Sequence, residues 1–327
     1  MADSGRAESL RVLVGADAIE PADRERLRRL FPHVSFTFAA TAEEWLAAAP
    51  RAEVLFTKGL PLEALAAATH LRWVQAGTAG VDWWLRSGLG ERDVILTNAR
   101  GAHGIPMAEQ VLAMALCFAT RLHLLIRGQP QRRKLARRVI EEKWELHGQT
   151  MLVLGLGDVG GTLAEKARAL GMHVLGVRRS LAPHPACVAI YPPERLHEAL
   201  PLADHVAVCL PLTPETAGII GEAELRLMKP TACIYNVGRG ATIDGAALRR
   251  ALAEGWIAGA GLDCVAPSDT PADGDPLWEM ENVILGLHTS GSSPSNSRRI
   301  TDLFAENLRR YLAGEPLLNV VDKQRGY

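Results

Sequence analysis

The segment VLGLGDVGG (153–161) constrains the fold more than any other part of this sequence. It places Gly155, Gly157 and Gly160 in GxGxxG spacing, directly after an apolar strand pattern and at the start of the helical pattern VGGTLAEKARALG. Glycines at these positions permit a tight turn and let the amides of a helix N-terminus approach a pyrophosphate closely. The spacing alone is a weak signal, but a second strand pattern, MHVLGV, follows in the right order. We therefore predict a dinucleotide-binding βαβ unit.

Short runs rich in Val, Ile and Leu alternate with longer helical patterns along most of the chain. One series of runs lies at 11–16, 34–39, 52–57, 71–77 and 94–99, and a second lies at 150–157, 172–177, 204–211, 232–238, 258–265 and 282–288. This alternation predicts parallel sheets with helices on both faces. Because 327 residues suffice for two cores, we predict two α/β lobes.

A long helical pattern beginning near Gly104 separates the two series and is a natural hinge element. After His288 the run TSGSSPSNS ends the second series, and SRRITDLFAENLRRYLAG (297–314) is an amphipathic helix with Gly314 as its stop. We expect this helix to return to the first lobe. The predicted domains are therefore 1–102 plus 292–327, for the substrate, and 103–291, an NAD(P)-binding Rossmann domain.

Composition excludes several other classes of protein. With 36 basic and 37 acidic residues, the chain has no global field for nucleic acid or a membrane surface, and a small molecule is the expected partner. The basic cluster at 132–138 is balanced by nearby glutamates and is interpreted as a solvated helix face. The apolar stretch 105–126 carries Glu109, Arg121 and His123, so a packed helix is expected there. The N-terminus shows no secretory pattern, and five cysteines form no CxxC pair, so we expect a cytoplasmic protein with reduced thiols, and no metal site.

The residues after the second strand of the βαβ unit bear on the choice of cofactor. Many NAD enzymes present an acidic residue there to the ribose hydroxyls, whereas this chain has Arg178, Arg179 and Ser180. Arginines suit a 2′-phosphate through forked, charge-assisted hydrogen bonds. We expect NADP(H) to be preferred with NAD(H) possible, although two exposed loop arginines are the alternative.

Two strand ends carry candidates for chemistry. Arg239 lies in YNVGRGATID and His288 ends NVILGLH, both at the edge where open α/β sheets bind ligands. A cation that polarises a keto acid and a proton donor for its oxygen are what a keto-acid reductase needs. Each residue alone is more often a structural hydrogen-bond donor.

Several motifs occur in the order seen in the D-isomer-specific 2-hydroxyacid dehydrogenases. From about Arg51 onward the chain resembles that family in LRWVQAGTAGVDWW, TNARGAHGIPMAEQVLAMAL, LVLGLGDVGG, CLPLTPETAGII, YNVGRGATIDGAAL, AGAGLDCV and DPLWEMENVILGLHTSG. The resemblance implies a flavodoxin-like substrate lobe, a Rossmann cofactor lobe, an active-site cleft between them and a homodimer.

The resemblance also implies roles for individual residues. Arg239 matches the arginine that binds the substrate carboxylate and carbonyl, and His288 matches the general acid. Ala79 and Gly80 match the loop whose amides hold the carboxylate. The positions expected to face the cofactor besides His288 and the residues above are Asp158 and Val159 at the phosphate loop, Cys209, Leu210 and Pro211 beside the adenosine, and Val237, Gly238 and Asp263 on the nicotinamide side.

One departure from the family pattern concerns the partner of the histidine. The family usually has a glutamate five residues after the strand aspartate, and here Ser268 occupies that place, followed by Asp269. The glutamate normally favours the protonated imidazole. Asp269 could replace it through a one-residue loop shift, Ser268 could orient the ring without charge, or catalysis could be impaired; we favour Asp269. Leu287 also replaces a proline common before the histidine, which should alter loop stiffness more than chemistry.

The expected activity is hydride transfer between NAD(P)H and a small 2-keto acid or D-2-hydroxy acid, with reduction of glyoxylate or hydroxypyruvate favoured. Trp83 and Trp84 follow the carboxylate loop and could narrow the pocket for such substrates, or simply pack in a core. The alternative is a dinucleotide-sensing regulatory or interaction protein on a dehydrogenase fold, for which the missing glutamate is the support.

Overall fold

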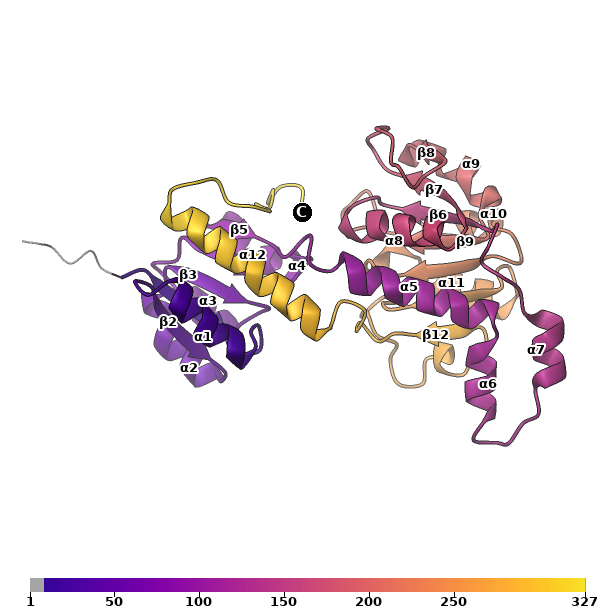
Figure 1. Ribbon diagram of the computed structural model, residues 1–327, viewed down its shortest axis with the longest axis horizontal. Coiled ribbons are helices and arrows are strands. Elements are labelled where there is room, and N and C mark those ends of the chain that lie inside the picture. The colour runs from indigo at the N-terminus through magenta and orange to yellow at the C-terminus, as the bar shows by residue number, and fades with distance from the viewer. Residues whose placement is uncertain (1–8, 327) are drawn as a thin grey trace, which may run out of the picture. The chain divides into compact units, whose positions relative to one another are not determined.

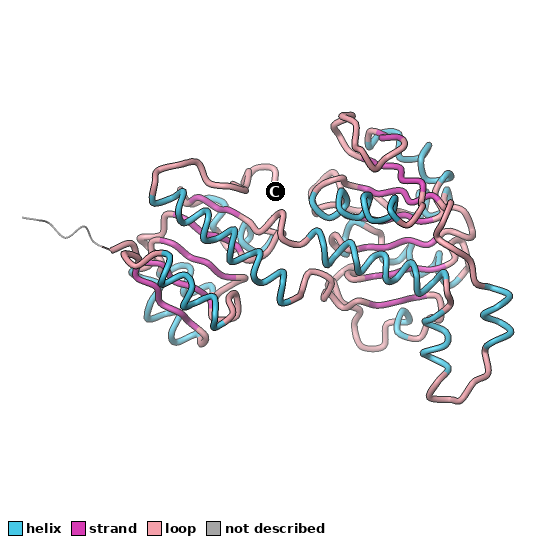
Figure 2. Tube along the Cα trace, viewed as in Figure 1, coloured by secondary structure: helices cyan, strands magenta, loops and turns pink. Residues whose placement is uncertain are grey.

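The computed structural model describes residues 9–326, which divide into two compact units (Figure 1). One unit ends at Ala102 and resumes at Ser293, and the other comprises His103–Ser292. Each is a parallel α/β sheet with helices packed over it (Figure 2). The predicted two-lobed α/β fold class is therefore confirmed.

The first unit contains a five-stranded parallel sheet with the order β2-β1-β3-β4-β5. Its strands are β1 (Arg11–Gly15), β2 (Ser35–Ala39), β3 (Val54–Thr57), β4 (Trp73–Ala76) and β5 (Ile95–Thr97), and its helices are α1 (Pro21–Leu30), α2 (Ala42–Ala48), α3 (Leu62–Ala67), α4 (Asp82–Arg86) and α12 (Pro294–Leu312). This is the flavodoxin-like order, in which the carboxyl ends of the strands form the ligand-binding edge.

Alternate residues along these strands enter two separate cores. Leu13 and Leu55 pack with α2 and α3, while Val12 and Phe56 pack with α1 and α12. The rings of Phe56 and Phe304 stack with their centroids 4.3 Å apart, so the C-terminal helix covers the first unit's sheet. Ser293, whose side chain accepts a hydrogen bond from the Asn296 amide, starts this helix four residues before the predicted pattern.

The second unit contains a seven-stranded parallel sheet with the order β12-β11-β10-β9-β6-β7-β8. Its strands are β6 (Thr150–Leu154), β7 (His173–Val177), β8 (Ala189–Tyr191), β9 (His205–Val208), β10 (Cys233–Asn236), β11 (Gly259–Leu262) and β12 (Val283–Leu285), and its helices are α5 (Gly104–Ala119), α6 (Leu122–Gly128), α7 (Ala136–Glu142), α8 (Asp158–Ala169), α9 (Leu196–Ala199), α10 (Glu222–Leu227) and α11 (Gly245–Ala253). Read from the β8 edge with β6 as strand 1, the order is 3-2-1-4-5-6-7, which contains the Rossmann arrangement 3-2-1-4-5-6. The short edge strand β8 was not predicted from the sequence.

Both faces of this sheet are buried. Met151 and Val153 pack under α5 and α8, whereas Leu152 and Leu154 face the core formed with α9, α10 and α11. A strand buried on both faces must be apolar at every position, which explains the continuous apolar runs in the sequence.

The segment between α5 and β6 is the charged connection. Arg137 pairs with Glu141 at 2.8 Å, and Arg138 pairs with Glu142 at 2.8 Å and Glu281 at 3.0 Å. These pairs support the interpretation of the basic cluster as a balanced, solvated face. Among the described residues no single helix is long and apolar enough to cross a membrane, and α5 with α6 meets that requirement only as a pair bent by 74°.

Candidate functional site

The loop between β6 and α8 has the form of a phosphate-binding turn. Gly155 has φ +90°, and a Cβ on Gly160 would lie 1.8 Å from the Gly155 carbonyl oxygen, so neither position tolerates a larger residue. A Cβ on Gly157 would meet no atom of the chain within 4 Å. Gly157 also precedes α8 without capping it through a side chain, which leaves the first amides of a 12-residue helix for an anion.

The other two predicted residues of this loop lie on its protein side. The Asp158 carboxylate Oδ1 lies 2.5 Å from where a Cβ on Gly104 would stand, so this side chain is directed at the start of α5. Val159 packs against the core under α5 and α8. The approach to the helix amides is therefore made by the glycines.

The turn after β6 contacts the loops that follow two other strands, β9 and β10. A Cβ on Gly155 would lie 2.9 Å from the Cys209 carbonyl oxygen, and one on Gly238 would lie 2.5 Å from that of Leu210. The loops after β6, β9 and β10 are thus in backbone contact at the point where the strand order reverses. Pro211 continues this surface, and its carbonyl accepts the Thr216 hydroxyl at 2.6 Å. Val237 is only 2% exposed and contributes to the core.

The three residues after β7 differ in what their side chains do. The Arg178 guanidinium donates to the carbonyls of Ala182 and Pro183, so it shapes its own loop. Arg179 and Ser180 are exposed, and the Ser180 hydroxyl accepts from the Ala182 amide at 3.4 Å. Arg179 and Ser180, more than Arg178, are placed to meet a ligand at this rim.

The turn after β10 carries Arg239. Asn236 was not predicted to matter, yet its side chain accepts from the Gly238 amide at 3.0 Å and donates to the Arg239 carbonyl at 3.0 Å. Thr242 also donates its hydroxyl to that carbonyl, at 2.7 Å. These bonds fix the backbone of Arg239, whose guanidinium bonds its neighbour's carbonyl at 2.9 Å.

Asp269 stands between the arginine turn and the histidine. Its Oδ2 lies 3.6 Å from Nδ1 of His288, and its Oδ1 accepts from the Gly240 amide at 3.0 Å. Asp269 has φ +62°, and this left-handed conformation, stabilised by the Val265 amide on its carbonyl at 3.0 Å, brings the carboxylate to the ring. Ser268 donates its hydroxyl to the Thr270 carbonyl at 2.8 Å instead.

The turn that carries His288 is tied to the end of β11. Asp263 is 3% exposed, and its carboxylate accepts from the amides of Thr289 and Ser290 at 3.0 and 3.1 Å. The His288 amide in turn donates to the Asp263 carbonyl at 2.6 Å. Ser290 was missed in the sequence because only its place beside a buried carboxylate distinguishes it.

The predicted carboxylate loop follows β4 in the first unit. Asn98 donates to the Ala79 carbonyl at 2.9 Å, and the Thr78 hydroxyl donates to the Gly80 carbonyl at 2.7 Å. No acceptor for the Ala79 or Gly80 amide is present in the described part of the chain. The loop therefore offers two fixed amide donors.

The two tryptophans after this loop differ in how far they are exposed. Trp84 is 1% exposed and belongs to the core with α2 and α3, so for this residue packing is the correct interpretation. Trp83 is 37% exposed and stands edge-on to Trp84, with ring centroids 4.9 Å apart. Of the two, Trp83 is the one exposed enough to contact a ligand.

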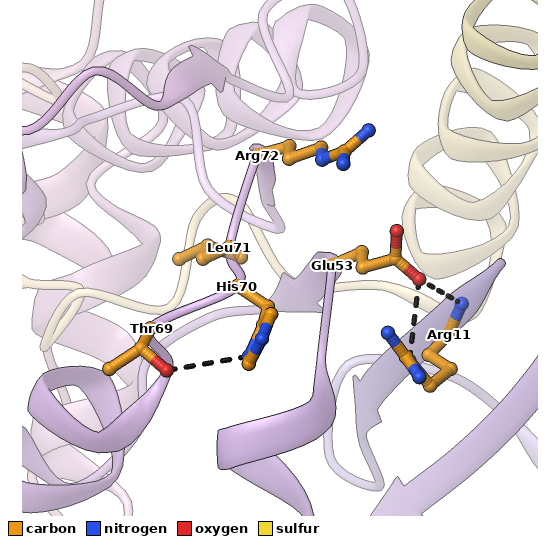
Figure 3. A pocket seen from close by; sticks show the side chains of 6 residues that line it. All are labelled: Arg11, Glu53, Thr69, His70, Leu71 and Arg72. Carbon is orange, nitrogen blue, oxygen red and sulfur yellow. Dashed lines mark hydrogen bonds and ion pairs between the residues drawn. The ribbon is translucent and has the colours of Figure 1, made fainter.

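A polar pocket elsewhere on the first unit lies at the wrong edge for this chemistry (Figure 3). Arg11 begins β1, Glu53 precedes β3 and Arg72 precedes β4, so the pocket lies at the amino ends of the strands. Within the pocket Arg11 pairs with Glu53 at 3.4 Å. We do not include it in the site.

The described residues show free cysteines and no cluster of metal-binding side chains. All five cysteines are free, and burial raises the pKa of Cys233 to about 12, so that thiol stays neutral. Within residues 9–326 no group of three or more His, Cys, Asp or Glu side chains is arranged to hold a metal ion.

Comparison with known proteins places these features among related chains. The family model described as "D-isomer specific 2-hydroxyacid dehydrogenase, NAD binding domain" matches residues 112–290. A glyoxylate reductase of Korarchaeum cryptofilum is 33% identical over 285 residues, which cover 83% of this chain and 82% of that protein.

Two solved structures are similar in fold as well as sequence. A D-isomer specific 2-hydroxyacid dehydrogenase family protein from Aeromonas salmonicida has a TM-score of 0.84 and 31% identity, covering 96% of this chain and 99% of that one. An NADPH-dependent glyoxylate/hydroxypyruvate reductase from Sinorhizobium meliloti, in complex with NADP and sulfate, has a TM-score of 0.83 and 25% identity, covering 97% of this chain and all of that one (100%).

Proposed function

The chain belongs to the D-isomer specific 2-hydroxyacid dehydrogenase family, and on that premise we propose that it reduces glyoxylate or hydroxypyruvate with NADPH. The observation that carries this proposal is the carboxylate of Asp269, which bonds the Gly240 amide beside Arg239 and faces His288 at 3.6 Å. A complete set of charged groups is thus present despite the serine at position 268. The relatives' names, glyoxylate reductase and glyoxylate/hydroxypyruvate reductase, support the choice of substrate.

The residues around the β6–α8 turn fit a dinucleotide. A Cβ would clash at Gly160 but would find open space at Gly157, and the α8 amides lack a side-chain cap, which together make a cradle for a pyrophosphate. When bound, the nicotinamide supplies the hydride. Arg179 and Ser180 would hold the 2′-phosphate that distinguishes NADPH from NADH, while Arg178 maintains their loop.

Arg239 and His288 would divide the work on the keto acid. The Arg239 guanidinium, fixed at its backbone by Asn236 and Thr242, binds the carboxylate and polarises the carbonyl. The family resemblance also assigns the Ala79 and Gly80 amides to the substrate carboxylate, and we keep that assignment as part of the proposal. Because Nδ1 of His288 faces Asp269, Nε2 is the nitrogen that delivers a proton to the oxygen that becomes the hydroxyl.

Asp269 would hold the ring of His288 at Nδ1, which lies 3.6 Å from its carboxylate. Asp269→Asn keeps the size of the side chain and removes its charge, so kcat for keto-acid reduction should fall. Asp273→Asn is the matched control, because Asp273 is exposed in the same loop and its side chain makes no hydrogen bond within the described residues. An unchanged kcat in Asp269→Asn would remove Asp269 from the mechanism.

We also propose that the protein forms a homodimer through the face made by α5, α6 and α7. Four large apolar side chains of these helices are exposed: Leu116 (43%), Leu122 (44%), Ile126 (53%) and Ile140 (68%). Figure 1 shows α6 and α7 standing out from the rest of the second unit. Light scattering should give a dimer for the wild type and a monomer for Ile126→Glu.

The location we propose is the cytoplasm. The protein's five cysteines are free, which fits a reducing compartment.

A further inference from the structure

The turn that presents His288 is conformationally costly. Leu287 and His288 have φ values of +54° and +57°, so two consecutive residues with side chains occupy the left-handed region. Such residues are uncommon and persist only where surrounding contacts hold them. The contacts that hold this turn therefore determine where the imidazole lies.

Most of those contacts come from one buried carboxylate. Asp263 accepts from the Thr289 amide, from the Ser290 amide and, through a short bond, from the Ser290 hydroxyl. Hydrogen bonds to a charged acceptor are stronger than neutral ones, and Asp263 and Ser290 are only 3% and 5% exposed. The three bonds hold the two residues that directly follow His288.

The backbone around the turn is shaped for this carboxylate. A Cβ on Gly286 would lie 2.6 Å from Oδ1 of Asp263, so glycine is needed for the close approach. The Thr289 hydroxyl donates to the Gly286 carbonyl at 2.7 Å and closes the turn on itself. The end of β11 and the turn after β12 therefore form one hydrogen-bonded unit.

We propose that Asp263 and Ser290 are a positioning pair that sets the orientation of His288 through the backbone. This inference rests on the proposed function, because it matters only if His288 delivers a proton. It differs from the role expected for Asp263 beside the nicotinamide, since the carboxylate is directed at the turn and three donors already occupy it. The pair acts on the backbone that follows His288, whereas the Asp269 carboxylate faces Nδ1 of the ring.

The test removes the serine hydroxyl and leaves the carboxylate in place. Ser290→Ala should lower kcat about tenfold while the NADPH dissociation constant, measured by nicotinamide fluorescence, stays within about twofold of wild type. Ser290→Thr, which restores a hydroxyl, should recover most of kcat. Ser292→Ala is the matched control, because Ser292 is exposed two residues further on and its side chain makes no hydrogen bond within residues 9–326.

Hydrogen exchange of the peptide 286–292 gives a readout that needs no turnover. Ser290→Ala should exchange faster there than Ser292→Ala. If the wild type reduces neither keto acid while this difference in exchange persists, the proposed function is wrong, but the Asp263–Ser290 pair still holds the turn. If exchange rises in Ser290→Ala but kcat is unchanged, or if the NADPH dissociation constant rises in step with the loss of kcat, the positioning role is overturned.

Discussion

A buried histidine at the amino end of a strand in the second unit's sheet predicts that the free energy of unfolding falls at acidic pH. His205 begins β9, is 1% exposed, and lies between Gln149 and Tyr235. The side-chain oxygen Oε1 of Gln149, 2.7 Å away, can only accept, so Nε2 of His205 donates to it, and Nδ1 accepts the Tyr235 hydroxyl at 3.0 Å. The Tyr235 bond requires the neutral ring, because a protonated Nδ1 can no longer accept. Burial lowers the pKa of His205 from 6.5 to about 4.

The sign and size of the effect follow from this lowered pKa. Above about pH 6.5 the ring is neutral in both the folded and unfolded states and adds no pH dependence. Between pH 6.5 and 4 only the unfolded chain binds the proton, so the free energy of unfolding falls as the pH falls. At about 1.4 kcal/mol per pKa unit, the loss between pH 7 and pH 5 amounts to about 2 kcal/mol.

Urea unfolding at pH 7 and pH 5 measures that loss. His205→Asn should be less stable than wild type at pH 7, because it breaks two buried hydrogen bonds, but should lose about 2 kcal/mol less on going to pH 5. His173→Asn, at an exposed histidine of β7 in the same sheet, should keep the wild-type pH dependence. Equal losses in wild type and His205→Asn would refute the reasoning.

Five further substitutions probe the candidate site. Gly157→Ala should leave the thermal midpoint of unfolding unchanged and weaken NADPH binding about tenfold or more, because no atom of the chain lies near its Cβ. Gly160→Ala should instead lower the thermal midpoint, because its Cβ would lie 1.8 Å from the Gly155 carbonyl oxygen. Equal midpoints in the two variants would contradict this reasoning. Arg179→Ala should lower kcat/KM for NADPH about tenfold relative to kcat/KM for NADH. Arg178→Ala should lower kcat/KM for both cofactors, because the Arg178 guanidinium holds the loop that carries Arg179. An equal loss of kcat/KM for NADPH and NADH in Arg179→Ala would show that Arg179 makes no contact with the 2′-phosphate. Leu287→Pro, which installs the residue common in the family, should lower kcat because proline cannot adopt φ +54°; wild-type kcat in this variant would show that the left-handed turn is dispensable.

Patterns along the sequence predicted the parts of the fold that depend on periodicity. Continuous apolar runs such as 150–154 indicated strands buried on both faces, and the glycine spacing identified the β6–α8 turn. β8 was missed because its three residues, each only partly buried, complete the sheet edge through pairing with β7, a tertiary contact with little local pattern.

The site was harder to predict where backbone conformation decides. Leu287, His288 and Asp269 adopt positive φ without being glycine. Asp and His do so more often than most residues, but Leu does not, so residue type alone does not predict the turns that bring His288 and Asp269 together. The direction of the Arg178 guanidinium, toward its own loop, is likewise set by carbonyls that the sequence does not place. The resemblance to the family supplied the residues proposed to react, and the structure supplied the contacts that hold them.

The most direct test of the account is NADPH consumption with glyoxylate and with hydroxypyruvate by wild type and His288→Ala. Turnover by the wild type and a loss of at least about a hundredfold in kcat for His288→Ala are the expected results, since general acid catalysis contributes on that order. Tight NADPH binding with no turnover of either keto acid would contradict the central claim and would favour a dinucleotide-sensing protein.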